Sequence, residues 1–192
     1  MERNITNKLE KAAKIAKRLH KFDPKSTEVS NYNEELRMQV SMLGDSKNKK
    51  TVEKQIEYVL ERMEANKVSP DMTTHSILFD KSLQDNNVDQ ANVHFRQVAQ
   101  SMAVERHSEI STQSLGEFFE QSLKVDNFDG LALLADYLEQ HSINISNWDM
   151  SKFRPALDFY LNHSFDLNRV FTFTRFYMRY VQSSLTGAQC ST

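Results

Sequence analysis

Breakers of regular structure and reactive thiols are both scarce in this chain. Its 192 residues include only 4 Gly, 3 Pro and 1 Cys. The single cysteine, Cys190, excludes a disulfide framework and a cysteine-rich zinc site. The few glycines and prolines, together with abundant Glu, Lys, Gln, Leu and Met, favour helices. We therefore predict an all-α protein.

Long apolar runs and catalytic motifs are lacking as well. No stretch of the sequence approaches the roughly 18 uninterrupted apolar residues that a membrane span needs. The glycines form no phosphate-binding loop, G-x-S-x-G is absent, and no two histidines follow H-x-x-x-H spacing. We therefore expect no catalytic residues, metal ligands, cofactor, small-molecule substrate or membrane span, which means a protein that is not an enzyme.

Charge is distributed unevenly, although the net charge is only −2. Residues 1–50 carry 12 basic and 7 acidic side chains, residues 51–150 carry 7 and 17, and residues 151–192 carry 5 and 2. The three segments therefore sum to +5, −10 and +3. Because phosphate neutralisation supplies much of the affinity for nucleic acid, the acidic middle counts against RNA binding along the whole chain.

Residues 61–78 have the pattern of a joint between two helical hairpins. A helix with apolar residues at helical spacing runs into Pro70, which ends it because proline has no amide hydrogen and a fixed φ. A hydroxyl of Thr73 or Thr74 is then expected to cap the next helix by accepting a hydrogen bond from an orphan amide. One helix is thus predicted to end, and the next to begin, within about eight residues.

The clearest internal repeat has an offset of 40 residues. Residues 79–89 align without gaps on residues 119–129, and a third copy at residues 157–166 fits with one residue deleted. The segments that follow the first two copies keep an apolar stripe with a period of 3.6 residues. Such periodicity is typical of stacked helical hairpins. We place the hairpins at about residues 29–66, 72–103, 111–141 and 150–182.

The predicted fold is an α-solenoid of about four antiparallel helical hairpins. Residues 1–28 are assigned to an N-terminal basic amphipathic helix and loop, residues 29–182 to the helical-repeat domain, and residues 183–192 to a flexible tail. The basic helix covers residues 4–21 and has an apolar side and a lysine-rich side. It fits a solvated capping helix, an organelle-targeting segment, or a contact with RNA or a partner.

The joint resembles the junction between pentatricopeptide repeats. In that family a second helix ends in an E-x-M-like run and a Pro-Asp pair, and the next repeat opens with a V-T-Y-N-T-L-I-like motif. The corresponding pieces here are residues 61–63 (ERM), Pro70-Asp71 and residues 72–78 (MTTHSIL). The resemblance implies a non-catalytic RNA-binding factor that acts in mitochondrial RNA processing, stability or translation.

The same resemblance nominates residues for base recognition. In the family, a polar residue on the inner face of the first helix and the last residue of the repeat together hydrogen-bond one RNA base. Single-stranded bases offer their edges to such side chains. Carried over by position, the pattern implies Asn33 with Asp71, Ser76 with Glu109, and Ser114 in the third hairpin. The offset between Ser76 and Ser114 is 38 residues, which disagrees with the 40-residue repeat.

The last predicted helix is rich in aromatic residues, which also suit a strand. Arg175 and Arg179 fall one helical turn apart, and Tyr177 and Tyr180 lie near them in the sequence. Three hypotheses remain open for these residues. They form a core stripe, a face that docks a partner, or a platform that stacks bases while the arginines meet phosphates.

A second hypothesis for the whole chain is a protein-binding scaffold or a small subunit of a larger ribonucleoprotein assembly. Irregular repeats, the acidic middle and the aromatic last helix favour it, and helical-repeat surfaces bind proteins as well as RNA. The expected partner is therefore single-stranded RNA, a protein in a larger complex, or both.

Overall fold

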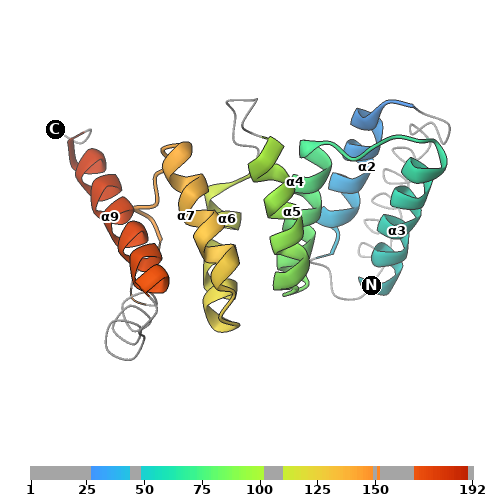
Figure 1. Ribbon diagram of the computed structural model, residues 1–192. Coiled ribbons are helices and arrows are strands. Elements are labelled where there is room, and N and C mark those ends of the chain that lie inside the picture. The colour runs from blue at the N-terminus through green and yellow to red at the C-terminus, as the bar shows by residue number, and fades with distance from the viewer. Residues whose placement is uncertain (1–26, 44–48, 102–109, 149–150, 152–166, 190–192) are drawn as a thin grey trace, which may run out of the picture. The chain divides into compact units, whose positions relative to one another are not determined.

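The computed structural model describes residues 27–43, 49–101, 110–148, 151 and 167–189 (Figure 1). All regular structure in these ranges is helical, which confirms the all-α prediction. The helices are α2 (Val29–Ser41), α3 (Lys49–Ala65), α4 (Met72–Gln84), α5 (Val88–Ser101), α6 (Thr112–Lys124), α7 (Phe128–Gln140) and α9 (Leu167–Gln189). The predicted basic helix at residues 4–21 and the first half of the fourth hairpin lie outside the described residues.

The chain divides into two compact units between Ile77 and Leu78, within helix α4. The first unit contains α2, α3 and the first turns of α4. The second unit contains the rest of α4 together with α5, α6, α7 and α9. We describe each unit separately.

In the first unit, α2 packs against α3. Polar side chains tie the two helices together as well: the amide of Asn66 donates to the hydroxyl of Tyr32 at 2.6 Å, and the guanidinium of Arg62 pairs with Glu35 at 2.8 Å. Each fully buried apolar side chain contributes roughly 1.5–3 kcal/mol. The core is formed by Tyr32, Leu36, Val40, Leu43, Val52, Ile56, Val59 and Met63.

An aromatic cluster forms the centre of the second unit. Phe95 of α5 has its ring centroid 5.4 Å from Phe79 of α4, 5.2 Å from Phe118 of α6 and 5.1 Å from Tyr137 of α7. All four side chains are fully buried. Since one ring comes from each of four helices, this cluster joins two successive hairpins into one core.

Helix α9 completes the second unit by packing against α7. Its buried rings are Phe173 and Phe176, and Phe176 lies 4.9 Å from Phe119 between ring centroids. The aromatic segment is therefore helical, as expected, and not a strand. The helix continues to Gln189, which corrects the prediction that a flexible tail begins at residue 183. Its aromatic face is held by the core, so the helix extends past the last of these rings.

The 40-residue repeat is present in the helix boundaries. Helices α4 and α6 both begin and end 40 residues apart, and α5 and α7 begin 40 residues apart. The turns agree as well, since Asn86 and Asp126 both adopt positive φ, 53° and 55°. In each turn the next amide donates to a carbonyl five residues earlier, at 2.9 Å. This is the hydrogen-bond pattern of a Schellman motif, and it ends both helices in the same way.

The joint between the first two hairpins also follows the sequence pattern, with one correction. Helix α3 ends at Ala65 and α4 begins at Met72, with Pro70 between them. The capping residue is Asp71, not Thr73 or Thr74. The Asp71 carboxylate accepts a hydrogen bond from the Thr74 amide at 2.7 Å, and the Asp71 amide donates to the Thr74 hydroxyl at 3.2 Å. This reciprocal pair satisfies two amides, which a threonine cap alone cannot do.

Candidate functional site

The structure brings Asn33 and Asp71 into direct contact. The Asn33 amide nitrogen donates to the Asp71 carboxylate at 3.0 Å, and the Asn33 carbonyl oxygen accepts from the Thr74 hydroxyl at 2.7 Å. The Thr74 hydroxyl also lies 2.8 Å from the same carboxylate oxygen of Asp71. We call Asn33, Asp71 and Thr74 the junction cluster. It ties α2 to the first turn of α4.

The junction cluster is closed to solvent on the Asn33 side. Asn33 is 3% exposed and Thr74 is 0% exposed. Burial alone raises the pKa of Asp71, but hydrogen bonds from the Thr74 amide, the Asn33 amide and the Thr74 hydroxyl outweigh it and hold the pKa below its usual value. The polar atoms nominated for reading a base are thus engaged in internal hydrogen bonds.

The other residues nominated by the resemblance take different positions. Ser76 is buried and, like Asn33, is the fifth residue of its helix. Ser114 is the third residue of α6, where its amide and hydroxyl both bond the capping residue Ser111, at 3.0 and 2.8 Å. The fifth residue of α6 is Gly116. Glu109 lies outside the described residues.

Both arginines of α9 are engaged within the second unit. The Arg175 guanidinium bonds Glu139 at 2.7 and 2.8 Å and also pairs with Asp136 at 2.7 Å. The hydrogen bond from Arg175 lowers the pKa of the Glu139 carboxyl. Arg179 donates to the Ile143 carbonyl at 2.8 Å. Tyr177 is exposed and Tyr180 is half-buried.

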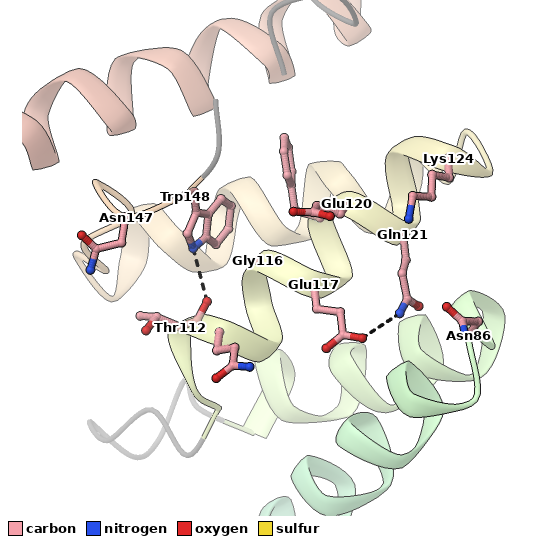
Figure 2. A pocket seen from close by; sticks show the side chains of 11 residues that line it. Asn86, Thr112, Gly116, Glu117, Glu120, Gln121, Lys124, Asn147 and Trp148 are labelled. Carbon is pink, nitrogen blue, oxygen red and sulfur yellow. Dashed lines mark hydrogen bonds between the residues drawn. The ribbon is translucent and has the colours of Figure 1, made fainter. Parts of the chain in front are cut away.

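A cavity of about 490 Å³ follows α6 in the second unit, and sequence reasoning missed it. We call it the α6 groove. Figure 2 shows Trp148 and Asn147 at one end of α6 and Lys124 and Asn86 at the other, with Glu117 between them. The ionisable side chains that line it are Glu117, Glu120 and Lys124.

The Trp148 end of the groove depends on a glycine. A Cβ atom placed on Gly116 would lie 3.2 Å from the indole nitrogen of Trp148, closer than most Cβ contacts. The indole nitrogen donates to the Thr112 carbonyl at 3.2 Å, and the Trp148 ring lies 5.4 Å from the Phe119 ring between centroids. The indole therefore lies directly against the backbone of α6 in a fixed orientation.

The middle of the groove is organised by Gln121. Its amide nitrogen donates to the Leu83 carbonyl at 2.9 Å and to the Glu117 carboxylate at 3.1 Å (Figure 2). Its own carbonyl oxygen is buried and has no hydrogen-bond partner. Gln121 thus connects α6 to the end of α4 and holds the carboxylate of Glu117 in place.

Two signals in the sequence point to this groove in retrospect. Gly116 is a glycine inside a helical pattern, which lowers helix propensity and therefore implies a packing reason. Trp148 is the only tryptophan of the chain. Nothing in the sequence connects these two residues, because they lie 32 positions apart (148 − 116) on either side of a complete helix.

Searches for other kinds of site gave no further candidate. Among the described residues, no group of three or more His, Cys, Asp or Glu side chains is placed to hold a metal ion. Within the same residues, no helix has the length and apolarity required to span a bilayer. In comparisons with known proteins, no family model, no curated protein and no solved structure matches the chain.

Proposed function

We propose that this chain is a non-catalytic helical-repeat protein that binds a basic segment of a partner protein in the α6 groove. The observation that carries the proposal is the groove itself, with the carboxylates of Glu117 and Glu120 and the ring of Trp148 in its lining. A surface with acceptors and an aromatic ring recognises cationic side chains.

Charge supports a protein partner over RNA. The groove is lined by two carboxylates and one ammonium group, and it lies within the segment that carries 17 acidic and 7 basic side chains. A carboxylate repels phosphodiester groups, whereas complementary charge speeds the encounter with a basic segment and selects against acidic partners. RNA would have to overcome that repulsion.

Size also supports a short extended segment. Helix α6 has 13 residues and is therefore about 20 Å long at 1.5 Å per residue. An extended chain advances roughly 3.3–3.6 Å per residue, so about six residues span the helix. A stretch of this length places two or three side chains on the side that faces the groove, since alternate side chains point to opposite faces.

RNA binding is the second candidate, and a specific observation favours it. Asn33 and Asp71, which the pentatricopeptide resemblance pairs, lie 3.0 Å apart. Under this candidate the mitochondrial roles implied by the resemblance would apply. It requires the Asn33 amide to exchange its internal hydrogen bonds for bonds to a base, and burial of Asn33 opposes that exchange.

Fluorescence anisotropy on the full chain tests the proposal. The probe is a labelled peptide of about eight residues in which lysine and arginine alternate with glycine, long enough to span α6. We expect saturable binding that the Glu117→Gln, Glu120→Gln double variant weakens by roughly five- to tenfold, because each exposed ion pair contributes up to about 1 kcal/mol.

The matched control removes the same charge from the other unit. Glu57 and Glu61 are exposed on α3, and the Glu57→Gln, Glu61→Gln double variant should change the affinity less than about twofold, since distant surface charges are screened. The proposal is wrong if the peptide does not bind, if both double variants act alike, or if a randomised single-stranded RNA binds more tightly than the peptide at the same salt.

A further inference from the structure

The chain builds one arrangement of three groups repeatedly: an arginine, an aromatic ring and a carboxylate. In the first unit the Arg62 guanidinium lies 5.4 Å from the Tyr32 ring centroid and 5.3 Å from that of Tyr58, and it pairs with Glu35 at 2.8 Å. The ring quadrupole and the carboxylate both attract the planar cation.

The second unit contains the arrangement twice more. Arg169 lies 5.2 Å from the Phe128 ring centroid and bonds both oxygens of Asp126 at 2.9 and 3.0 Å. Arg175 lies 5.9 Å from the Phe171 ring centroid and also bonds both oxygens of Glu139. In three places, therefore, an aromatic ring beside a carboxylate is occupied by a guanidinium.

The α6 groove presents the ring and the carboxylate without the arginine. Trp148 forms one end of the groove, and Glu117 follows Gly116, against which the indole lies. Within the described residues, Glu117 bonds Gln121 and has no ion-pair partner. A carboxylate offers about four lone-pair sites, so the bond to Gln121 leaves acceptor capacity.

Both groups are held in place before any ligand arrives. The indole is fixed by its hydrogen bond to Thr112 and by the Phe119 ring behind it. The Glu117 carboxylate is fixed by Gln121, which is itself anchored to the Leu83 carbonyl. Little side-chain freedom is left to lose on binding, and such preorganisation favours affinity.

We propose that the α6 groove takes an arginine side chain of the partner protein, whose guanidinium stacks on the Trp148 ring and bonds the Glu117 carboxylate. The inference rests on the proposed function and names the side chain that the groove selects. Arginine fits better than lysine because its planar guanidinium stacks on a ring and bonds a carboxylate at the same time, whereas an ammonium group is compact and strongly hydrated. Gln121 acts as a positioning residue for Glu117.

Intrinsic fluorescence tests the inference, since Trp148 is the only tryptophan of the chain. Three peptides of the same glycine-rich sequence carry arginine, lysine or citrulline at one central position, in an otherwise identical basic background. We expect the arginine peptide to change the Trp148 emission saturably and to bind at least about threefold more tightly than the lysine peptide. Citrulline has the shape of arginine without its charge, and we expect its peptide to bind at least about tenfold more weakly.

Two variants locate the arginine. Glu117→Gln keeps the shape of the side chain and should remove most of the preference for arginine over citrulline. Gly116→Ala places a methyl group against the indole and should reduce the emission change, while circular dichroism reports whether the helices remain. Glu61→Gln, exposed on α3, is the control and should leave the preference unchanged.

The outcomes separate this inference from the proposed function. If the basic peptides bind by anisotropy but arginine and lysine bind equally and the Trp148 emission does not respond, the arginine pocket is wrong and the groove proposal stands. If no peptide binds, both fail. An emission change produced by single-stranded RNA, and not by the peptides, would assign the indole to base stacking and overturn the inference.

Discussion

The first turns of α4 and α6 use the same local pattern, yet their surroundings make them different. In each helix the capping residue, Asp71 or Ser111, accepts a hydrogen bond from the amide three residues later, at 2.7 and 3.0 Å. At α4 the third residue, Thr74, is fully buried and bonds Asn33 from α2. At α6 the equivalent residue, Ser114, is half-buried, and the helix borders a groove.

This difference teaches that a capping pattern determines where a helix begins but not what the polar residues around it do. Asn33 arrives at the start of α4 from another helix and turns three polar side chains into a structural joint. At α6, Trp148 arrives from beyond α7 and covers Gly116 instead. The polar groups of α4 are consumed by the fold, and those of α6 remain at the edge of a cavity.

The largest expected effect comes from breaking the junction cluster. Thr74→Val keeps the side-chain shape but removes the donor to Asn33 and the acceptor for the Asp71 amide. Since an unsatisfied buried polar group costs about 1–3 kcal/mol, we expect a loss of about 2–3 kcal/mol in the free energy of unfolding. Urea unfolding followed by circular dichroism measures it.

The matched substitution at the other helix is Ser114→Ala. Its hydroxyl is partly exposed, and its loss leaves the Ser111 hydroxyl within reach of water, so we expect a cost below about 1 kcal/mol. Equal losses for the two variants would contradict the distinction between a consumed and an open helix start, because both hydroxyls would then contribute through the cap alone.

Much of this fold could be predicted from periodicity, and the parts that could not are long-range contacts. The apolar stripes of α2, α3, α5 and α7 are buried as predicted, because helical spacing of apolar residues is a local property. The 40-residue repeat holds at the helix boundaries for the same reason. The cap at Asp71 was missed because two threonines follow it, and a hydroxyl pattern alone does not choose among adjacent capping residues.

The candidate site was less predictable than the fold. Asn33 and Asp71 meet as the resemblance implies, but nothing in the sequence indicated that Thr74 would bond to both of them. The register of the third hairpin was taken from Ser114, whereas the helix begins at Thr112 and its fifth residue is Gly116. The groove depends on Trp148 and Gly116 meeting across α7, which no local pattern encodes.

A smaller effect should separate two carboxylates of α4 by their response to pH. The pKa of Asp71 lies below 3.8, because hydrogen bonds outweigh burial. Stability from Asp71 is therefore present above its unfolded pKa, about 3.9, and is lost as pH falls through the lower folded value. Burial raises the pKa of Asp80, against a hydrogen bond from Ser114 that lowers it. Ionised Asp80 therefore costs stability at neutral pH, and this cost disappears as pH falls through the raised value.

Asp71→Asn and Asp80→Asn should consequently act with opposite signs. At pH 7 we expect Asp71→Asn to lower the free energy of unfolding by about 1 kcal/mol, since a charged cap also interacts with the helix dipole. Asp80→Asn should raise it or leave it unchanged. Both differences from the parent chain should shrink towards pH 3, where the parent carboxyls take up protons. Urea midpoints at the two pH values measure this, and two variants of the same sign would refute it.

The smallest expected effect concerns the residues that end the helices. Lys67 in the first unit and Asn86 in the second both adopt positive φ, 57° and 53°. The amide after Lys67 donates to the Met63 carbonyl at 2.9 Å, so this turn ends α3 by the same Schellman pattern that ends α4. Asparagine tolerates this conformation through local hydrogen bonds, whereas lysine meets the full clash of its Cβ with the backbone.

Replacing each residue with glycine should therefore stabilise the first unit more than the second. We expect Lys67→Gly to raise the free energy of unfolding by about 0.5–1 kcal/mol and Asn86→Gly by less, because glycine adopts positive φ without strain. Lys67→Ala is the control, since it removes the charge and keeps the Cβ atom, and it should give no gain. A gain from Lys67→Ala equal to that from Lys67→Gly would attribute the effect to charge, and the backbone conformation at residue 67 would then carry no cost.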